Sequence, residues 1–222
     1  MPGCGGFVVT RLTGTGLIAD DLYLLAHDDL SGRPFLQPRA LGVGLAAGLL
    51  AELAVDGVIR VRADRVVPGA LTPPANGLAG YVVGVLLGER ELHPVRDWLM
   101  FLAATAPQDV ARRLALAGYL MQVPSRRPWR PGRWVPLDAD GAFAPVIRVR
   151  SVLDPARKPA AAEVLLTGLA TACGLGPRLL PYGPPDGRQR LDAAIRVLSP
   201  GLRELIAQTQ AAVDSAVLSH RM

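Results

Sequence analysis

The residues with the clearest chemical potential lie in one basic and aromatic segment, residues 125–134, which reads SRRPWRPGRW. No acidic residue lies within it, and the nearest is Asp138. Arginine pairs with phosphate, and tryptophan settles at the boundary between lipid and water. The sequence therefore predicts four residues that bind lipid phosphate and two that lie at the membrane interface: Arg126, Arg127, Arg130 and Arg133, and Trp129 and Trp134.

The same segment is open to two other interpretations. Arginine and tryptophan also suit nucleic acid, through phosphate contacts and stacking on bases. Alternatively, the segment is a solvated loop whose tryptophans pack back onto the body of the protein. The sequence alone favours the membrane interpretation and leaves the other two open.

A second cluster of chemical groups is His27-Asp28-Asp29. These residue types suit acid–base or metal chemistry, but a helix end followed by a turn explains them equally well. The motifs CxxC, HExxH, GxSxG and the phosphate-binding loop are absent from the sequence. We therefore expect no catalytic residue, no metal and no cofactor.

Residues 42–47 match the loose dinucleotide-binding pattern G-x-G-x-x-A, and Asp64 follows Gly44 by the expected spacing. However, Pro34 and Pro38 interrupt the residues that would form the preceding strand. We expect that these glycines instead allow neighbouring helices to approach closely.

The surrounding elements are predicted to be mainly helical. The stretch 39–56 has only Glu52 charged between its ends, which places it at the centre of a bundle. Residues 58–62 and 64–67 alternate as a short hairpin, and 121–150 lacks a helical period and is predicted as a second hairpin or loop. Apolar spacing, prolines and glycine stops predict helices over 17–26, 39–56, 77–87, 94–104, 107–117, 160–173, 188–198 and 202–218.

One unit occurs twice: a helix, a glycine and an apolar strand, built around Gly57 and again around Gly118. Winged-helix domains use this unit, so an alternative function is a nucleic-acid-binding regulator. In that case Arg112 and Arg113 would contact phosphate, and the basic segment would follow the nucleic acid backbone.

Composition narrows the class of protein. The 222 residues are 50% hydrophobic and 19% charged, so a substantial core forms and the chain is not disordered. The net charge of +5 fits an anionic partner. Two cysteines form no framework, and neither a secretory signal nor a run of about 20 apolar residues is present, so we expect a cytoplasmic location.

Several blocks resemble the Golgi phosphoprotein 3 family in its bacterial, actinomycete form. They are residues 17–26 (LIADDLYLLA), Asp28-Asp29, Gly32-Arg33, 40–61, 110–120, and 154–157 followed by the helix to Cys173. Their order and spacing, over most of the chain, carry the resemblance.

The resemblance implies one domain over 1–222, with residues 1–13 flexible and 121–150 as a projecting hairpin. It also implies hydrophobic central helices ringed by amphipathic ones. Eukaryotic members are peripheral membrane adaptors that bind phosphatidylinositol 4-phosphate, and their hairpin takes part in self-association. The implied function is non-enzymatic and takes place at the inner face of the membrane, with an anionic phospholipid surface and a protein client as partners.

The resemblance also locates the family's lipid pocket. Its tryptophan falls on Gln37 and its arginines fall on Ala46, Gln108 and Ala111, so all four side chains are replaced in this sequence. Arg39, Arg112 and Arg113 lie close by and are predicted to bind lipid phosphate in their place. This pattern favours non-specific binding of anionic lipid over specific recognition of a phosphoinositide.

Overall fold

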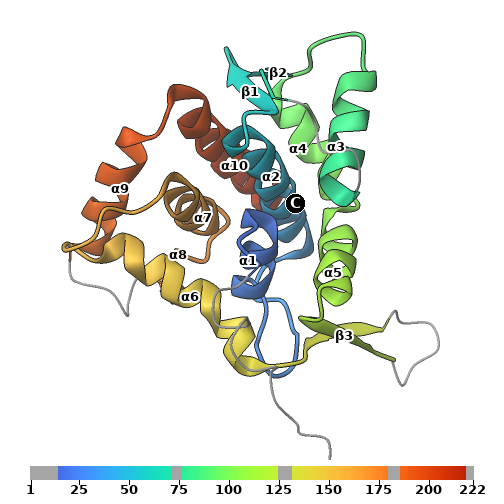
Figure 1. The fold of residues 1–222 in the computed structure, drawn as a ribbon, viewed down its shortest axis with the longest axis vertical. Helices are drawn as coiled ribbons and strands as arrows, with labels where there is room; N and C mark the ends of the chain where they lie inside the picture. The colour runs from blue at the N-terminus through green and yellow to red at the C-terminus, as the bar shows by residue number, and fades with distance from the viewer. Residues whose placement is uncertain (1–14, 72–76, 125–131, 180–185, 219–222) are drawn as a thin grey trace, which may run out of the picture.

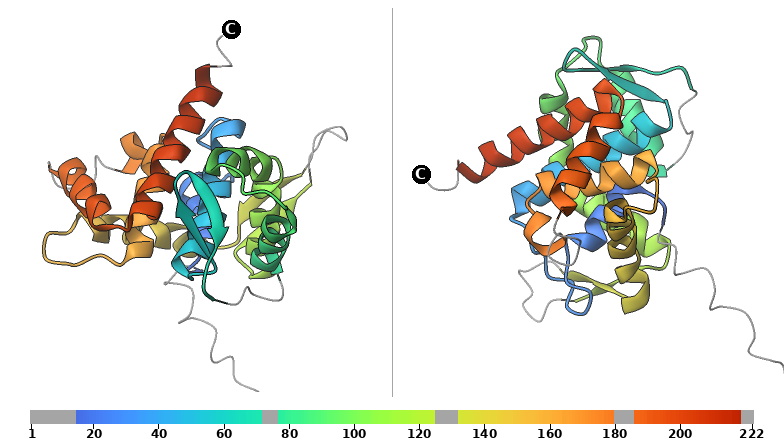
Figure 2. Two further views of the ribbon diagram at one scale, coloured as in Figure 1. Left: turned by 90° about the horizontal axis from the view of Figure 1, so that it is seen from above. Right: turned by 90° about the vertical axis from the view of Figure 1, so that its left-hand side faces the viewer.

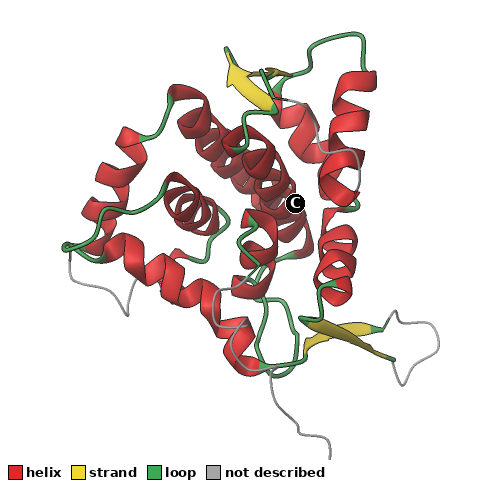
Figure 3. Ribbon diagram, in the orientation of Figure 1, coloured by secondary structure: helices red, strands yellow, loops and turns green. Residues whose placement is uncertain are grey.

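A computed structural model describes residues 15–71, 77–124, 132–179 and 186–218. Within these ranges the chain forms ten helices and two separate antiparallel hairpins, which confirms the mainly helical fold that the sequence predicts (Figures 1 and 3). The helices are α1 (Ile18–Leu25), α2 (Pro38–Val55), α3 (Gly77–Gly88), α4 (Val95–Ala103), α5 (Ala106–Leu116), α6 (Ala139–Leu153), α7 (Ala161–Ala172), α8 (Gly176–Leu179), α9 (Gly187–Val197) and α10 (Pro200–Leu218).

Helix α2 forms the centre of the bundle. It packs against α1, α4, α5, α7 and α10, and Figure 1 shows these helices around it. By length and composition α2 would be able to cross a membrane, but 78% of it is buried inside the protein, as in the core helix of a globular fold. This confirms the central place predicted from its near lack of charge.

The glycines of α2 are packing residues, as predicted, rather than a nucleotide loop. A methyl group on Gly42 would lie 2.5 Å from the carbonyl oxygen of Ala103, and one on Gly48 would lie 2.8 Å from the Cα of Ala19. Each contact is too short for a real Cβ, so α4 and α1 approach α2 this closely only because these positions are glycine.

The two hairpins begin with the repeated helix–glycine–strand unit. Strands β1 (Ile59–Arg62) and β2 (Arg65–Pro68) follow α2, and β3 (Leu120–Val123) pairs with β4 (Arg133–Pro136) after α5. Gly57 and Gly118 have φ values of +71° and +78°. In each case the next residue's N–H donates to a carbonyl five residues back, at 2.9 Å, so the left-handed glycine ends the helix and turns the chain into a strand.

The second predicted hairpin is shorter than the sequence suggested. Residues 139–153 form helix α6, although 121–150 was predicted to be a hairpin or loop, so that prediction was wrong for its second half. Pro145 lies inside α6 and the residues after it alternate, and both features mask a helical period. Burial of Ala142, Val149 and Leu153 against the core stabilises the helix despite the proline.

Candidate membrane-contact surface

The hairpin β3–β4 projects from one end of the bundle, beside the end of α5 (Figure 1; Figure 2, left). Arg133 is exposed at the start of β4, opposite Val123 in the ladder. The tip of the hairpin falls outside the described residues, and with it the predicted ligands Arg126, Arg127 and Arg130 and the predicted interface residue Trp129.

Trp134 is half-buried and packs against the apolar core. The loop after α1 fixes the position of its backbone, because Gly32 lies directly against the Trp134 carbonyl. A Cβ on Gly32 would lie 2.0 Å from that oxygen, and Gly32 also has a φ of +61°. This ring therefore packs on the body of the protein, as the solvated-loop alternative predicts for it.

Exposed apolar side chains gather where the hairpin joins the bundle. Leu116 ends α5 and is 91% exposed, Met121 lies in β3 and is 48% exposed, and Leu137 follows β4 and is 50% exposed. The Leu137 N–H donates to the Tyr119 carbonyl at 2.9 Å, which holds the segment after β4 against the end of α5. The base of the hairpin thus carries large apolar groups in contact with water.

The two neighbouring arginines of α5 have different environments. The Arg112 side chain is 64% exposed, and its closest acidic partner is Asp109 at 3.9 Å. Arg113 is turned into the protein: its Nε donates to Asp20 Oδ1 at 2.7 Å, and its two terminal nitrogens donate to the two Glu52 oxygens at 2.9 Å each.

Arg113 therefore belongs to a buried ionic cluster rather than to the surface. Asp20 is 1% exposed and Glu52 is 7% exposed, and Glu52 also accepts the N–H of Ala19 at 2.8 Å. Arg113 thus joins α1, α2 and α5 through three hydrogen bonds. This internal role competes with the contact to lipid phosphate that the sequence predicts for it.

A second ion pair lies beside this cluster, where Arg148 of α6 donates to Asp21 of α1. Burial raises the pKa of Asp20 and of Asp21 to about 6, although Arg113 and Arg148 oppose this shift. The sequence analysis missed this network. Its signal was the presence of three acids, Asp20, Asp21 and Glu52, within two otherwise apolar helices.

The remaining predicted positions are divided between surface and core. Arg39 and Gln37 are exposed at the start of α2. This helix runs between the end of the molecule that carries β1–β2 and the end that carries the β3–β4 hairpin (Figure 1). Gln108 is exposed on α5. Ala46 and Ala111 are fully buried in the core.

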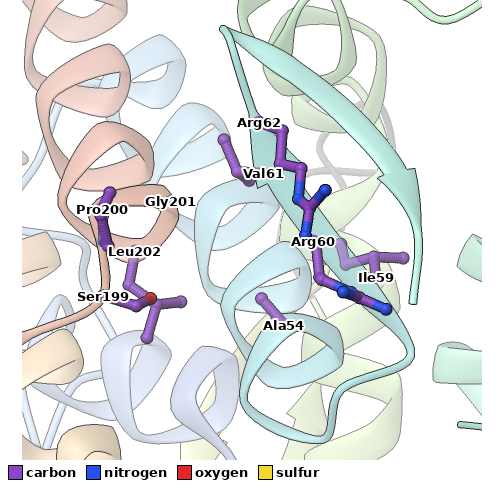
Figure 4. A pocket seen from close by; sticks show the side chains of 9 residues that line it. All are labelled: Ala54, Ile59, Arg60, Val61, Arg62, Ser199, Pro200, Gly201 and Leu202. Atoms are coloured by element: carbon purple, nitrogen blue, oxygen red, sulfur yellow. The ribbon is translucent and has the colours of Figure 1, made fainter. Parts of the chain in front are cut away.

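The nucleic-acid alternative requires Arg112 and Arg113 of α5 to contact phosphate. Arg113 is instead held by the internal carboxylates of Asp20 and Glu52. A pocket of about 300 Å³ does lie between β1 and the start of α10, with Arg60 and Arg62 in its lining. Figure 4 shows their guanidinium groups beside the strand, away from Ser199 and Pro200. The pocket lining is otherwise mainly apolar, and we assign it no anion.

Comparison with known families agrees with this architecture. A family model described as Golgi phosphoprotein 3 (GPP34) matches residues 18–217. The match begins with the first residue of α1 and ends within the last turn of α10, so it spans the whole bundle and both hairpins. A comparison with curated proteins finds no match.

Proposed function

The chain belongs to the Golgi phosphoprotein 3 (GPP34) family, and we propose that it binds anionic lipid at a membrane surface. The surface that makes this contact is the end of the bundle that carries the β3–β4 hairpin, called the hairpin end below. Members of the family are generally non-enzymatic lipid-binding adaptors at membranes. The binding is peripheral and takes place on the cytoplasmic face. It depends on charge and exposed apolar surface rather than on a pocket for one phosphoinositide.

The observation that carries the proposal is the mixed surface at the base of the hairpin. Arg112 is exposed on α5 together with Leu116, Met121 and Leu137 of this base, and Arg133 is exposed nearer the tip of the hairpin, opposite Val123. Apolar side chains gain free energy by entering the headgroup region, and each arginine near an anionic surface contributes about 1 kcal/mol.

The sequence supplies further predicted ligands. Arg126, Arg127 and Arg130, with Trp129, lie in the sequence that joins β3 to β4 and add three positive charges and one amphipathic ring. Arg39, exposed at the start of α2, adds another charge. Arg113 is omitted from the proposed set because its guanidinium is already paired.

Vesicle sedimentation tests the proposal. The protein should bind vesicles of phosphatidylglycerol and phosphatidylcholine and should bind pure phosphatidylcholine vesicles far less. The variant Arg112→Gln, Arg133→Gln should weaken binding by about 30-fold, since two contacts of about 1 kcal/mol each are lost. The matched control, Arg60→Gln, Arg62→Gln, removes two exposed arginines from the β1–β2 hairpin, and it should leave binding unchanged.

Two results would refute the proposed function. One is equal binding to neutral and anionic vesicles, because the arginines would then have no role. The other is an equal loss of binding in the test and control variants, because binding would then follow total charge and not the hairpin end.

A further inference from the structure

A second pocket, with a volume of about 290 Å³, lies between the loop after α1 and helices α6 and α8. Its apolar lining includes Leu24, Leu25, Ala142, Val146 and Leu179, and its polar lining comes from both acids and bases. The loop brings His27, Asp28 and Asp29, the cluster that the sequence analysis singled out without a role. Volumes of this size suit a small ligand or a headgroup.

Two arginines bring positive charge to this pocket, and each lies over an aromatic ring. The guanidinium carbon of Arg178 is 3.5 Å from the centre of the Phe35 ring, and that of Arg150 is 5.7 Å from the centre of the Phe143 ring. Because a guanidinium stacked on a ring keeps its N–H groups at its edge, Arg178 can still donate to an anion such as phosphate.

The negative charge of the pocket comes from Asp28, which lies in a loop closed by hydrogen bonds. Asp28 Oδ1 accepts the Ser31 N–H at 2.7 Å, and the Asp28 N–H donates to the Arg33 carbonyl at 2.9 Å. The hydrogen bonds from Ser31 and the charge of Arg178 hold the pKa of Asp28 below its ordinary value. The loop therefore holds a carboxylate in the pocket that is charged at neutral pH.

His27 adds an acceptor to the same pocket. Its Nδ1 lies 2.7 Å from the carbonyl oxygen of Tyr23, which only accepts, so Nδ1 carries the proton. Burial lowers the pKa of His27, and the ring is neutral at pH 7. The Nε2 atom is then a lone-pair acceptor, and stacking on Tyr23, with ring centres 3.9 Å apart, fixes the orientation of the ring.

The lining combines guanidinium donors with carboxylate and imidazole acceptors, which suits a ligand that carries both an anion and an N–H cation. We propose that this pocket binds a phosphoethanolamine group, with its phosphate at Arg178 and its ammonium at Asp28 and His27. A phosphate alone would meet Asp28 and Asp29, which repel it. A choline headgroup has no N–H to donate to the His27 ring.

The position of the pocket indicates that a lipid supplies the phosphoethanolamine group. The loop that carries His27 and Asp28 packs against β4 through Gly32, beside the hairpin that we propose to contact lipid. The start of α6, which brings Phe143, also lies at this end of the molecule (Figure 1). This assignment to a lipid rests on the proposed function, whereas the chemistry of the headgroup does not.

Titration with the free headgroup tests the chemistry, followed by backbone-amide NMR shifts of the full chain. Phosphoethanolamine should bind at least about ten-fold more tightly than phosphocholine or inorganic phosphate. The variant Arg178→Gln should abolish binding. The variant Asp28→Asn keeps an oxygen for the Ser31 N–H, so the loop is retained, and it should remove the preference over phosphocholine. The control Arg60→Gln should change nothing.

Vesicles test the source. With phosphatidylglycerol held constant, wild-type protein should bind phosphatidylethanolamine vesicles several-fold better than phosphatidylcholine vesicles, and Asp28→Asn should remove only that preference. If free phosphoethanolamine binds selectively but no vesicle is bound, the proposed function fails and the assignment of the pocket stands. Equal shifts with phosphate and phosphoethanolamine, or shifts away from the pocket, would overturn the inference even if anionic vesicles bind.

Discussion

Removal of the Arg113 guanidinium should destabilise the protein strongly. The variant Arg113→Met keeps most of the side chain's apolar length and removes three hydrogen bonds, one to Asp20 and two to Glu52. Both carboxylates are almost fully buried and would be left without their cation. Loss of one partner from a buried pair costs about 3–5 kcal/mol, which in a protein of this size corresponds to a fall in Tm of about 6–20 °C.

The matched control is the next residue in the chain. Arg112 is the same residue type on the same helix, but its side chain is 64% exposed and its pair with Asp109 is loose. Arg112→Met should therefore change the free energy of unfolding by less than about 0.5 kcal/mol. Urea unfolding followed by circular dichroism at pH 7 measures both variants under one condition.

A second substitution probes the mechanism. If the cost comes from uncompensated buried charge, then Asp20→Asn introduced into Arg113→Met should restore part of the lost stability, because one of the two charges is gone. Equal stability of the Arg112 and Arg113 variants would refute the reasoning. So would a loss of vesicle binding in Arg113→Met without any loss of stability, since Arg113 would then be a surface ligand.

Three further predictions concern glycines and pH. Gly32→Ala should cost about 2 kcal/mol or more in thermal unfolding, because the position has a positive φ and faces the Trp134 carbonyl. Gly48→Ala should cost about 1–3 kcal/mol because the new methyl group meets α1, whereas Gly84→Ala on α3 meets nothing within 4 Å and should stabilise by up to about 1 kcal/mol. Asp21→Asn should gain stability relative to wild type as pH rises from 4 to 7. The pKa of the Asp21 carboxyl is about 6 in the folded protein and 3.8 ordinarily, so wild type releases this proton on unfolding in that range and loses stability as pH rises, whereas the variant does not. Urea unfolding of both proteins at pH 4 and pH 7 measures the trend, which would be opposite if the folded-state pKa were lowered.

The sequence predicts the helices of this fold well where local signals agree. The glycine stops at 57 and 118, the prolines at the starts of α4 and α5, and the apolar spacing all indicate the same boundaries within one or two residues. Helix α6 was not predicted because its local signals conflict. Pro145 and the alternating residues after it argue against a helix, and only tertiary packing against α1 and α7 outweighs them.

The pocket beside α8 also could not be predicted from the sequence. His27 and Asp28 are adjacent in the chain, but Arg150 and Arg178 come from two other helices more than 120 residues later. No local pattern links these positions. The cluster of His27 and Asp28 becomes a candidate binding site only because the fold places arginines from distant helices in the same pocket.

The two arginines of α5 show what a closer use of the sequence would have found. Arg112 and Arg113 are identical in type, and both were assigned to lipid. However, Arg113 lies next to Leu114 and three residues after Val110, on the buried side of the helix. Glu52 is the one charged residue within the central part of the most apolar long helix, and a buried carboxylate needs a buried cation. The demand for charge balance in the core therefore identifies Arg113 as a structural residue and leaves Arg112 as the arginine of α5 that is available to a lipid surface.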